Sequence, residues 1–166
     1  MNMNCRSDIP YPPLAVEGKN KRYADILMPL YIGSGGELTS LSSYAYQALI
    51  TEPKDKRLSD ILECISLTEM THFRMLGKLI VKLGGDPVLY IPYNKNRRQY
   101  WNSSFCDNIY DQRAFINSNI SSEKKAVENY KRAYELINDR FIRDVIKRII
   151  IDEEHHIKIF KELSDN

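Results

Sequence analysis

The sequence predicts an all-α fold, in which four long helices form one bundle and a long crossover joins the second helix to the third. Two observations carry this prediction. Apolar residues recur every three or four positions along four separate stretches of the chain, which is the spacing of amphipathic helices. The connections between these stretches are short, long and short, and this order is typical of helical bundles with one crossover.

The first twenty residues are expected to form an extended arm. Pro10, Pro12 and Pro13 lie there, and proline lacks a backbone donor and disfavours a helical conformation in the residue before it. Residues 21–166 are then expected to form a single bundle domain, because a chain of 166 residues is long enough to bury one hydrophobic core.

The first helical stretch covers about residues 23–50, and three glycines between positions 33 and 36 interrupt it. Its first turns are therefore expected to be kinked or separate from the rest. The second stretch covers about residues 58–83 and ends at the "GGDP" of 84–87, where glycine terminates the helix and proline prevents its continuation.

Residues 88–108 show no helical period and are rich in aromatic residues and asparagine, so we predict a crossover on the outside of the bundle. The third helix is expected over about residues 109–138. The fourth is expected to begin near Phe141 and to fill the rest of the chain.

Composition excludes several classes of protein. A net charge of +2 is too small to indicate a nucleic-acid or membrane-surface partner. No segment has the length or hydropathy of a signal peptide or a membrane span. Cys5, Cys64 and Cys106 are far apart in the sequence and form no CxxC pair, so they indicate no zinc or rubredoxin-type site. The simplest expectation is a cytoplasmic protein.

Carboxylates and histidines fall on the inward faces of the predicted helices. Glu69 and His72 share the apolar face of the second helix, and Glu153 and His156 share that of the fourth, while His155 lies off that face. A glutamate and a histidine three residues apart on a helix can reach one metal ion. The first and third helices each add one inward glutamate. The six candidate metal ligands are Glu37, Glu69, His72, Glu123, Glu153 and His156.

Burial is the stronger argument for a metal site. A single Glu-x-x-His pair is usually a surface pair, but four carboxylates inside one bundle would repel each other and would each cost several kcal/mol of desolvation. Two divalent cations would neutralise the four charges, so the sequence predicts a site for two metal ions.

The chain resembles the ferritin-like superfamily on the side of the rubrerythrins and manganese catalases, which implies a ferritin-like four-helix bundle. The matching stretches are "GGELTSLSSY", "TEMTHFRMLGKLI", "ISSEKKAVENY" and "IDEEHHIKIF". The resemblance implies that Glu37 and Glu123 bridge or cap two metal ions and that each Glu-x-x-His supplies an oxygen and a nitrogen ligand. It also implies that Tyr44 hydrogen-bonds a ligand carboxylate, although Tyr44 could equally be an ordinary core aromatic residue.

The chain also departs from these families. It lacks the four cysteines of a rubredoxin-type iron site, so a peroxidase cycle would need an external electron donor. Ser122 stands beside Glu123, where manganese catalases often place charged groups. Met70 occupies the position of a haem-ligating methionine in bacterioferritins, but packing is the better interpretation.

The functional hypothesis is a protein with two iron or manganese ions that acts on hydrogen peroxide or dioxygen. We place first a rubrerythrin-like peroxidase or oxidase without the rubredoxin domain. The alternatives are a manganese catalase, which needs no external donor, and a non-catalytic metal-binding or structural protein. The aromatic crossover and the proline-rich arm expose more apolar surface than one bundle covers, so a homo-oligomer is expected.

Overall fold

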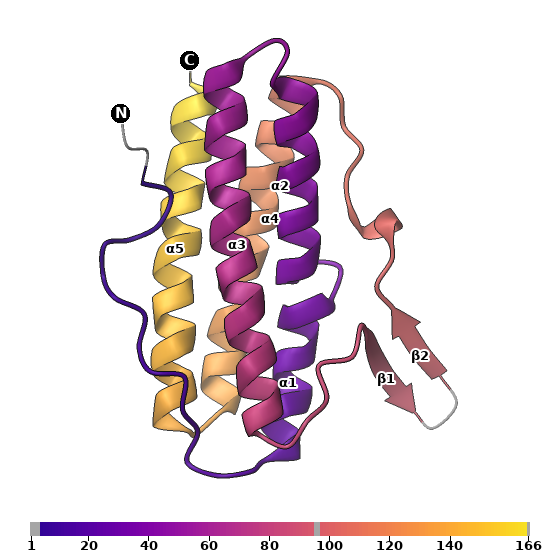
Figure 1. Ribbon diagram of the computed structural model, residues 1–166, viewed down its shortest axis with the longest axis vertical. Coiled ribbons are helices and arrows are strands. Elements are labelled where there is room, and N and C mark those ends of the chain that lie inside the picture. Colours follow the sequence, from indigo (N-terminus) through magenta and orange to yellow (C-terminus); the bar gives the residue numbers. More distant parts are fainter. Residues whose placement is uncertain (1–3, 95–96, 166) are drawn as a thin grey trace.

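The computed structural model describes residues 4–94 and 97–165 of the chain, and within them it confirms the predicted all-α bundle (Figure 1). The helices are α1 (Lys21–Ile32), α2 (Glu37–Thr51), α3 (Lys56–Lys82), α4 (Gln112–Leu136) and α5 (Arg140–Ser164). Because α2 continues upward from α1 along one edge of the molecule, the five helices fill the four positions of a ferritin-like bundle.

The break between α1 and α2 confirms the expected interruption at the glycines. The backbone approaches itself so closely there that a side chain on Gly36 would lie 2.6 Å from the carbonyl oxygen of Leu30, and one on Gly33 would overlap that of Pro29. Only glycine fits both positions. The break restarts the helix at Glu37, whose side chain is buried although it stands in the first turn of α2.

The end of α3 is also as predicted. Gly84 has a φ of 81°, which is the left-handed conformation that favours glycine, and its N–H donates to the carbonyl of Val81 at 2.9 Å. The N–H of Gly85 donates to Ile80 at 2.9 Å. These bonds satisfy carbonyl groups at the last turn and direct the chain away from the bundle.

The crossover contains structure that the sequence analysis did not predict. Strands β1 (Tyr90–Asn94) and β2 (Arg97–Tyr100) form an antiparallel hairpin beside α1, and a short 3-10 helix, η1 (Ser103–Phe105), follows (Figure 1). Residues 95 and 96, between the strands, lie outside the described part. After the hairpin, the Trp101 indole N–H donates to the Thr39 hydroxyl at 3.0 Å, so the crossover is fixed to α2.

The N-terminal segment from residue 4 to residue 20 contains no helix or strand and runs along α5 (Figure 1). Residues 1–3 of the expected arm lie outside the described part, and the division into an arm and a bundle domain stays a prediction. Cys5 is fully buried in this segment and forms a disulfide with Cys64 of α3. The spacing of the cysteines did not indicate this pairing.

The core consists of two hydrophobic clusters with a polar layer between them. On α3, one cluster ends at Ile65 and the other begins at Met75. On α5, the corresponding limits are Ile149 and Phe160. Glu69, His72, Glu153 and His156 fall in these gaps, so apolar side chains close the polar layer at both ends.

No helix in residues 4–94 or 97–165 combines the length and the hydropathy that crossing a membrane requires.

The Cys5–Cys64 bond should contribute about 2–4 kcal/mol to the free energy of unfolding, because it closes a loop with a sequence separation of 59. Urea unfolding of the Cys5→Ser variant should show this loss, and added reductant should not increase it. Cys106→Ser is the matched control, since Cys106 lies outside the disulfide. Equal stability of the wild type and Cys5→Ser under oxidising conditions would contradict the prediction.

Candidate metal centre

The polar layer brings together the six side chains that the sequence singled out. Each is at most 3% exposed, and they come from α2, α3, α4 and α5. The helical register on α5 is as predicted, because Glu153 and His156 are buried, Glu154 is exposed and His155 is only partly buried.

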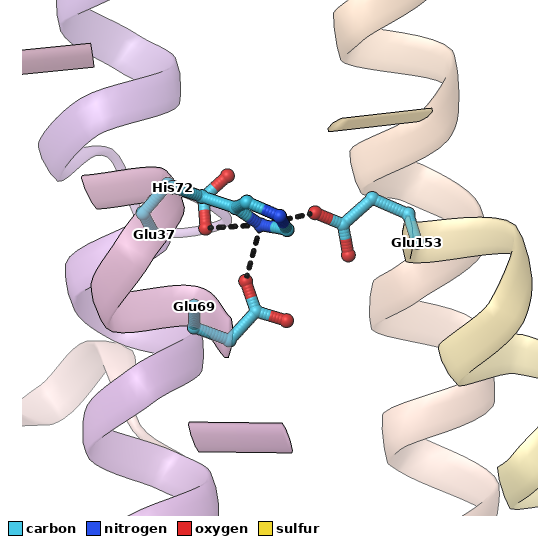
Figure 2. A group of neighbouring side chains, drawn as sticks. All are labelled: Glu37, Glu69, His72 and Glu153. Atoms are coloured by element: carbon cyan, nitrogen blue, oxygen red, sulfur yellow. Dashed lines mark hydrogen bonds and ion pairs between the residues drawn. The ribbon is translucent and has the colours of Figure 1, made fainter. Parts of the chain in front are cut away.

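Three carboxylates surround one ring nitrogen of His72 (Figure 2). The Nδ1 atom lies 3.2 Å from Glu153 Oε1, 3.4 Å from Glu69 Oε2 and 3.6 Å from Glu37 Oε2. Figure 2 shows these carboxylates approaching the imidazole from different sides, which is the arrangement of donors around a common centre.

A second group surrounds His156. Its Nδ1 atom lies 3.0 Å from Glu69 Oε1, 3.3 Å from Glu153 Oε2 and 3.6 Å from Glu123 Oε1. Glu69 and Glu153 therefore belong to both groups, with one oxygen near each histidine, whereas Glu37 and Glu123 each belong to one. The family resemblance left open whether Glu37 and Glu123 bridge or cap the metal ions, and these roles stay a prediction.

The two groups fit a pair of divalent cations. Buried polar atoms without a hydrogen-bond partner are costly, yet several lie here among the described residues. They are Glu37 Oε2, Glu69 Oε1, both carboxylate oxygens of Glu153 and both ring nitrogens of His156. Hard carboxylate oxygens combined with imidazole suit iron or manganese. The donor set therefore supports a site for two metal ions of this kind.

Without ions, the layer is electrostatically unfavourable. Burial raises the pKa of Glu37 and of Glu123 well above the usual range, and neighbouring carboxylates add to the effect. Burial alone would lower the pKa of His72 and of His156, but the surrounding carboxylates outweigh it and raise both values well above 6.5. These shifts favour the protonated forms of the four groups, and metal ions would replace the protons.

Two buried tyrosines bind the outer carboxylates. The Tyr44 hydroxyl donates to Glu123 Oε1 at 2.5 Å, and the Tyr130 hydroxyl donates to Glu37 Oε1. Tyr44 thus makes the hydrogen bond that the resemblance implied. Nothing in the spacing of Tyr130 in the sequence indicated its contact with Glu37.

Asp152 is a buried acid that the sequence analysis missed. Its Oδ2 lies 3.0 Å from His72 Nε2 and accepts from the Tyr11 hydroxyl at 2.7 Å, while its Oδ1 pairs with Arg148 at 2.6 Å. Burial would raise the pKa of Asp152, but these partners outweigh it and lower the pKa far below the usual range. A hydrogen on His72 Nε2 bonded to Asp152 leaves Nδ1 free to face the carboxylates.

The N-terminal segment completes this network from outside. The backbone N–H of Ser7 donates to Asp152 Oδ1 at 2.7 Å. Arg148 donates to the carbonyls of Ile9 and Ser7 at 2.6 and 2.8 Å. Residues 7–11 therefore cover the polar layer on the side of α3 and α5. Asp152 directly precedes Glu153 in the sequence. It lies about 100° from Glu153 around the helix, so the helical period that singled out Glu153 did not single out Asp152.

Met70 is 40% exposed and belongs to neither hydrophobic cluster, so the structure does not place it in the core as the packing interpretation required.

Comparison with known proteins identifies the family. The family model described as Rubrerythrin matches residues 32–164, which is most of the chain. The chain belongs to the rubrerythrin family. A curated protein named "Probable manganese catalase", from Clostridium acetobutylicum, is 28% identical over 164 residues, covering 89% of this chain and 72% of its own. Two crystal structures of KatB, a manganese catalase from Anabaena, match this rubrerythrin-family fold with a TM-score of 0.82. Each is 21% identical and covers 96% of this chain and 78% of its own.

Replacing His156 with Ala should lower bound metal and thermal stability, because the substitution removes the only nitrogen donor of the second group. His155→Ala is the matched control: this neighbouring imidazole bonds the carbonyl of Asn4 at 3.0 Å and points away from the layer. Elemental analysis and thermal unfolding test both variants. Equal metal loss from the two would contradict the assignment.

The metal-free protein should lose stability as the pH rises above the ordinary pKa of a carboxyl group and on through the imidazole range. The raised pKa values of Glu37, Glu123, His72 and His156 mean that folding favours their protonated forms, and this contribution disappears as the pH passes each folded-state pKa. Metal ions displace the same protons, so stabilisation by added Mn²⁺ or Fe²⁺ should grow over this range. Thermal unfolding at a series of pH values tests both statements. A metal-free protein that is more stable at the alkaline end would contradict them.

Proposed function

We propose that this protein consumes hydrogen peroxide at a centre of two metal ions, iron or manganese, held by Glu37, Glu69, His72, Glu123, Glu153 and His156. The observation that carries the proposal is the sharing of Glu69 and Glu153 between the two donor groups. Shared carboxylates hold two ions close together, and two adjacent redox-active ions supply a two-electron exchange with one peroxide molecule.

Disproportionation is the form of this reaction that we now place first, ahead of the donor-dependent peroxidase that the sequence analysis favoured. The reaction converts two molecules of hydrogen peroxide into two of water and one of dioxygen, so it needs no external reductant. The similarity to the Clostridium acetobutylicum protein named as a probable manganese catalase supports this order, because it extends over 89% of the chain.

A donor-dependent peroxidase is the second candidate, and the match to the rubrerythrin family model supports it. The electron donor would have to be another molecule, because the chain has three cysteines and two of them form the disulfide.

The side chains around the centre would orient the ligands. Tyr44 and Tyr130 each hold one outer carboxylate through a hydroxyl, and Asp152 holds His72 through Nε2. The two hydrophobic clusters exclude water from both ends of the layer. In such a dry environment, a misplaced or missing carboxylate changes the charge balance far more than it would in water.

Homo-oligomer formation stays a prediction. Leu49 and Leu67 are 70% and 63% exposed on the outer surface of α2 and α3, where a second copy could cover them.

Metal-loaded protein should release dioxygen from hydrogen peroxide without added reductant. Glu37→Gln and Glu123→Gln should each lower kcat/KM at least about tenfold, because each removes a negative charge from the ligand set. Glu154→Gln is the matched control, since this exposed glutamate of α5 lies one residue from Glu153 but faces away from the centre. An oxygen electrode measures the reaction, and elemental analysis reports bound metal.

Turnover that appears only with an electron donor would select the peroxidase instead. A fully metallated wild type that is inert toward both peroxide and dioxygen would contradict the proposal and favour the metal-handling or structural alternative.

A further inference from the structure

The metal centre is buried, so hydrogen peroxide needs a path to it. On the basis of the proposed function, we infer that peroxide enters through a polar pocket between α2 and α4, with Tyr44 at its inner end. The pocket has a volume of about 320 Å³, and both helices and the crossover contribute to its lining.

The pocket leads from solvent toward the centre. Ser34, Ser122 and Lys125 line it and are exposed, whereas Tyr44, also in the lining, is only 2% exposed. The hydroxyl of Tyr44 donates to Glu123 at 2.5 Å. One side chain therefore separates the inner end of the pocket from a carboxylate of the second donor group.

The chemistry of the lining suits a small polar ligand. Ser40, Ser43 and Ser122 line the same space, and each carries a hydroxyl group. A hydroxyl both donates and accepts hydrogen bonds, as hydrogen peroxide does, so these groups can replace part of the hydration that peroxide loses on entry.

Buried amides keep the two walls at a fixed spacing. Gln47 on α2 and Asn119 on α4 exchange two hydrogen bonds, of 3.1 and 2.7 Å, and both side chains line the pocket. The pair joins the helices directly at this level, since breaking it would leave buried amide groups without partners. Its position limits the inner width of the pocket and favours small ligands.

Within residues 4–94 and 97–165, both ends of the layer and its side at α3 and α5 are covered. The hydrophobic clusters fill the bundle on both sides of the layer along its axis. On the side of α3 and α5, Tyr11, Ser7 and Ile9 bond directly to Asp152 and Arg148, and the Cys5–Cys64 disulfide fixes that segment to α3. The α2–α4 side carries the polar opening.

Replacing Ser122 with Trp tests the route, because an indole would fill much of the pocket without touching a proposed ligand. In metal-loaded protein, stopped-flow absorption should show azide associating with the metal ions at least about tenfold more slowly. Bound metal and the equilibrium affinity for azide should stay at wild-type values. The kcat/KM for peroxide should fall by a similar factor. Ser43→Trp, on the opposite wall, should behave in the same way.

Ser121→Trp is the matched control: the same substitution is made one residue away on α4, at an exposed position outside the pocket lining. It should leave azide association unchanged. Wild-type association rates in both wall variants, or equal slowing in Ser121→Trp, would overturn the inference. A wild type that is inert toward peroxide would overturn only the proposed reaction, because azide association still measures the route.

Discussion

Repulsion among the four buried carboxylates of Glu37, Glu69, Glu123 and Glu153 is the constraint on which the rest of the structure depends. Four negative charges in one layer of a bundle core are unstable unless cations or protons accompany them. The two imidazoles lie within 3.6 Å of these carboxylates, and Tyr44 and Tyr130 donate to the two outer ones. Along the helices, an apolar cluster lies beyond each end of the polar layer. These two clusters supply the hydrophobic stabilisation that the polar layer cannot.

The two donor groups have similar ligand sets but different surroundings. His72 has a partner for Nε2 in Asp152, and the N-terminal segment covers it from outside. His156 has no hydrogen-bond partner for Nε2 within residues 4–94 and 97–165. Glu123, which accepts the hydrogen bond of the pocket residue Tyr44, belongs to the group of His156. The donor group of His72 is therefore oriented by a fixed network, while that of His156 contains the carboxylate bonded to Tyr44 at the proposed entrance.

Local sequence was sufficient to predict the bundle and the six clustered side chains. The helical period places Glu69 and His72 on the same face as Ile65 and Leu76, and all four are buried. The N-terminal contacts could not be predicted in this way, because Ser7 and Asp152 are 145 residues apart and no period relates them. The Cys5–Cys64 pair and the hairpin after α3 likewise depend on tertiary packing, which a helical period does not encode.

The extended conformation of the N-terminal segment has a physical cause in the Asp152–Arg148 pair. A buried ion pair is stable only when its remaining donors and acceptors also find partners. Ser7 provides a backbone N–H to Asp152, and Ser7 and Ile9 provide carbonyls to Arg148. Within a helix, such groups are largely taken up by bonds along its axis, so a helical segment could not make these contacts. The prolines at positions 10, 12 and 13 disfavour that helix, and so keep these backbone groups free to complete the network that orients His72.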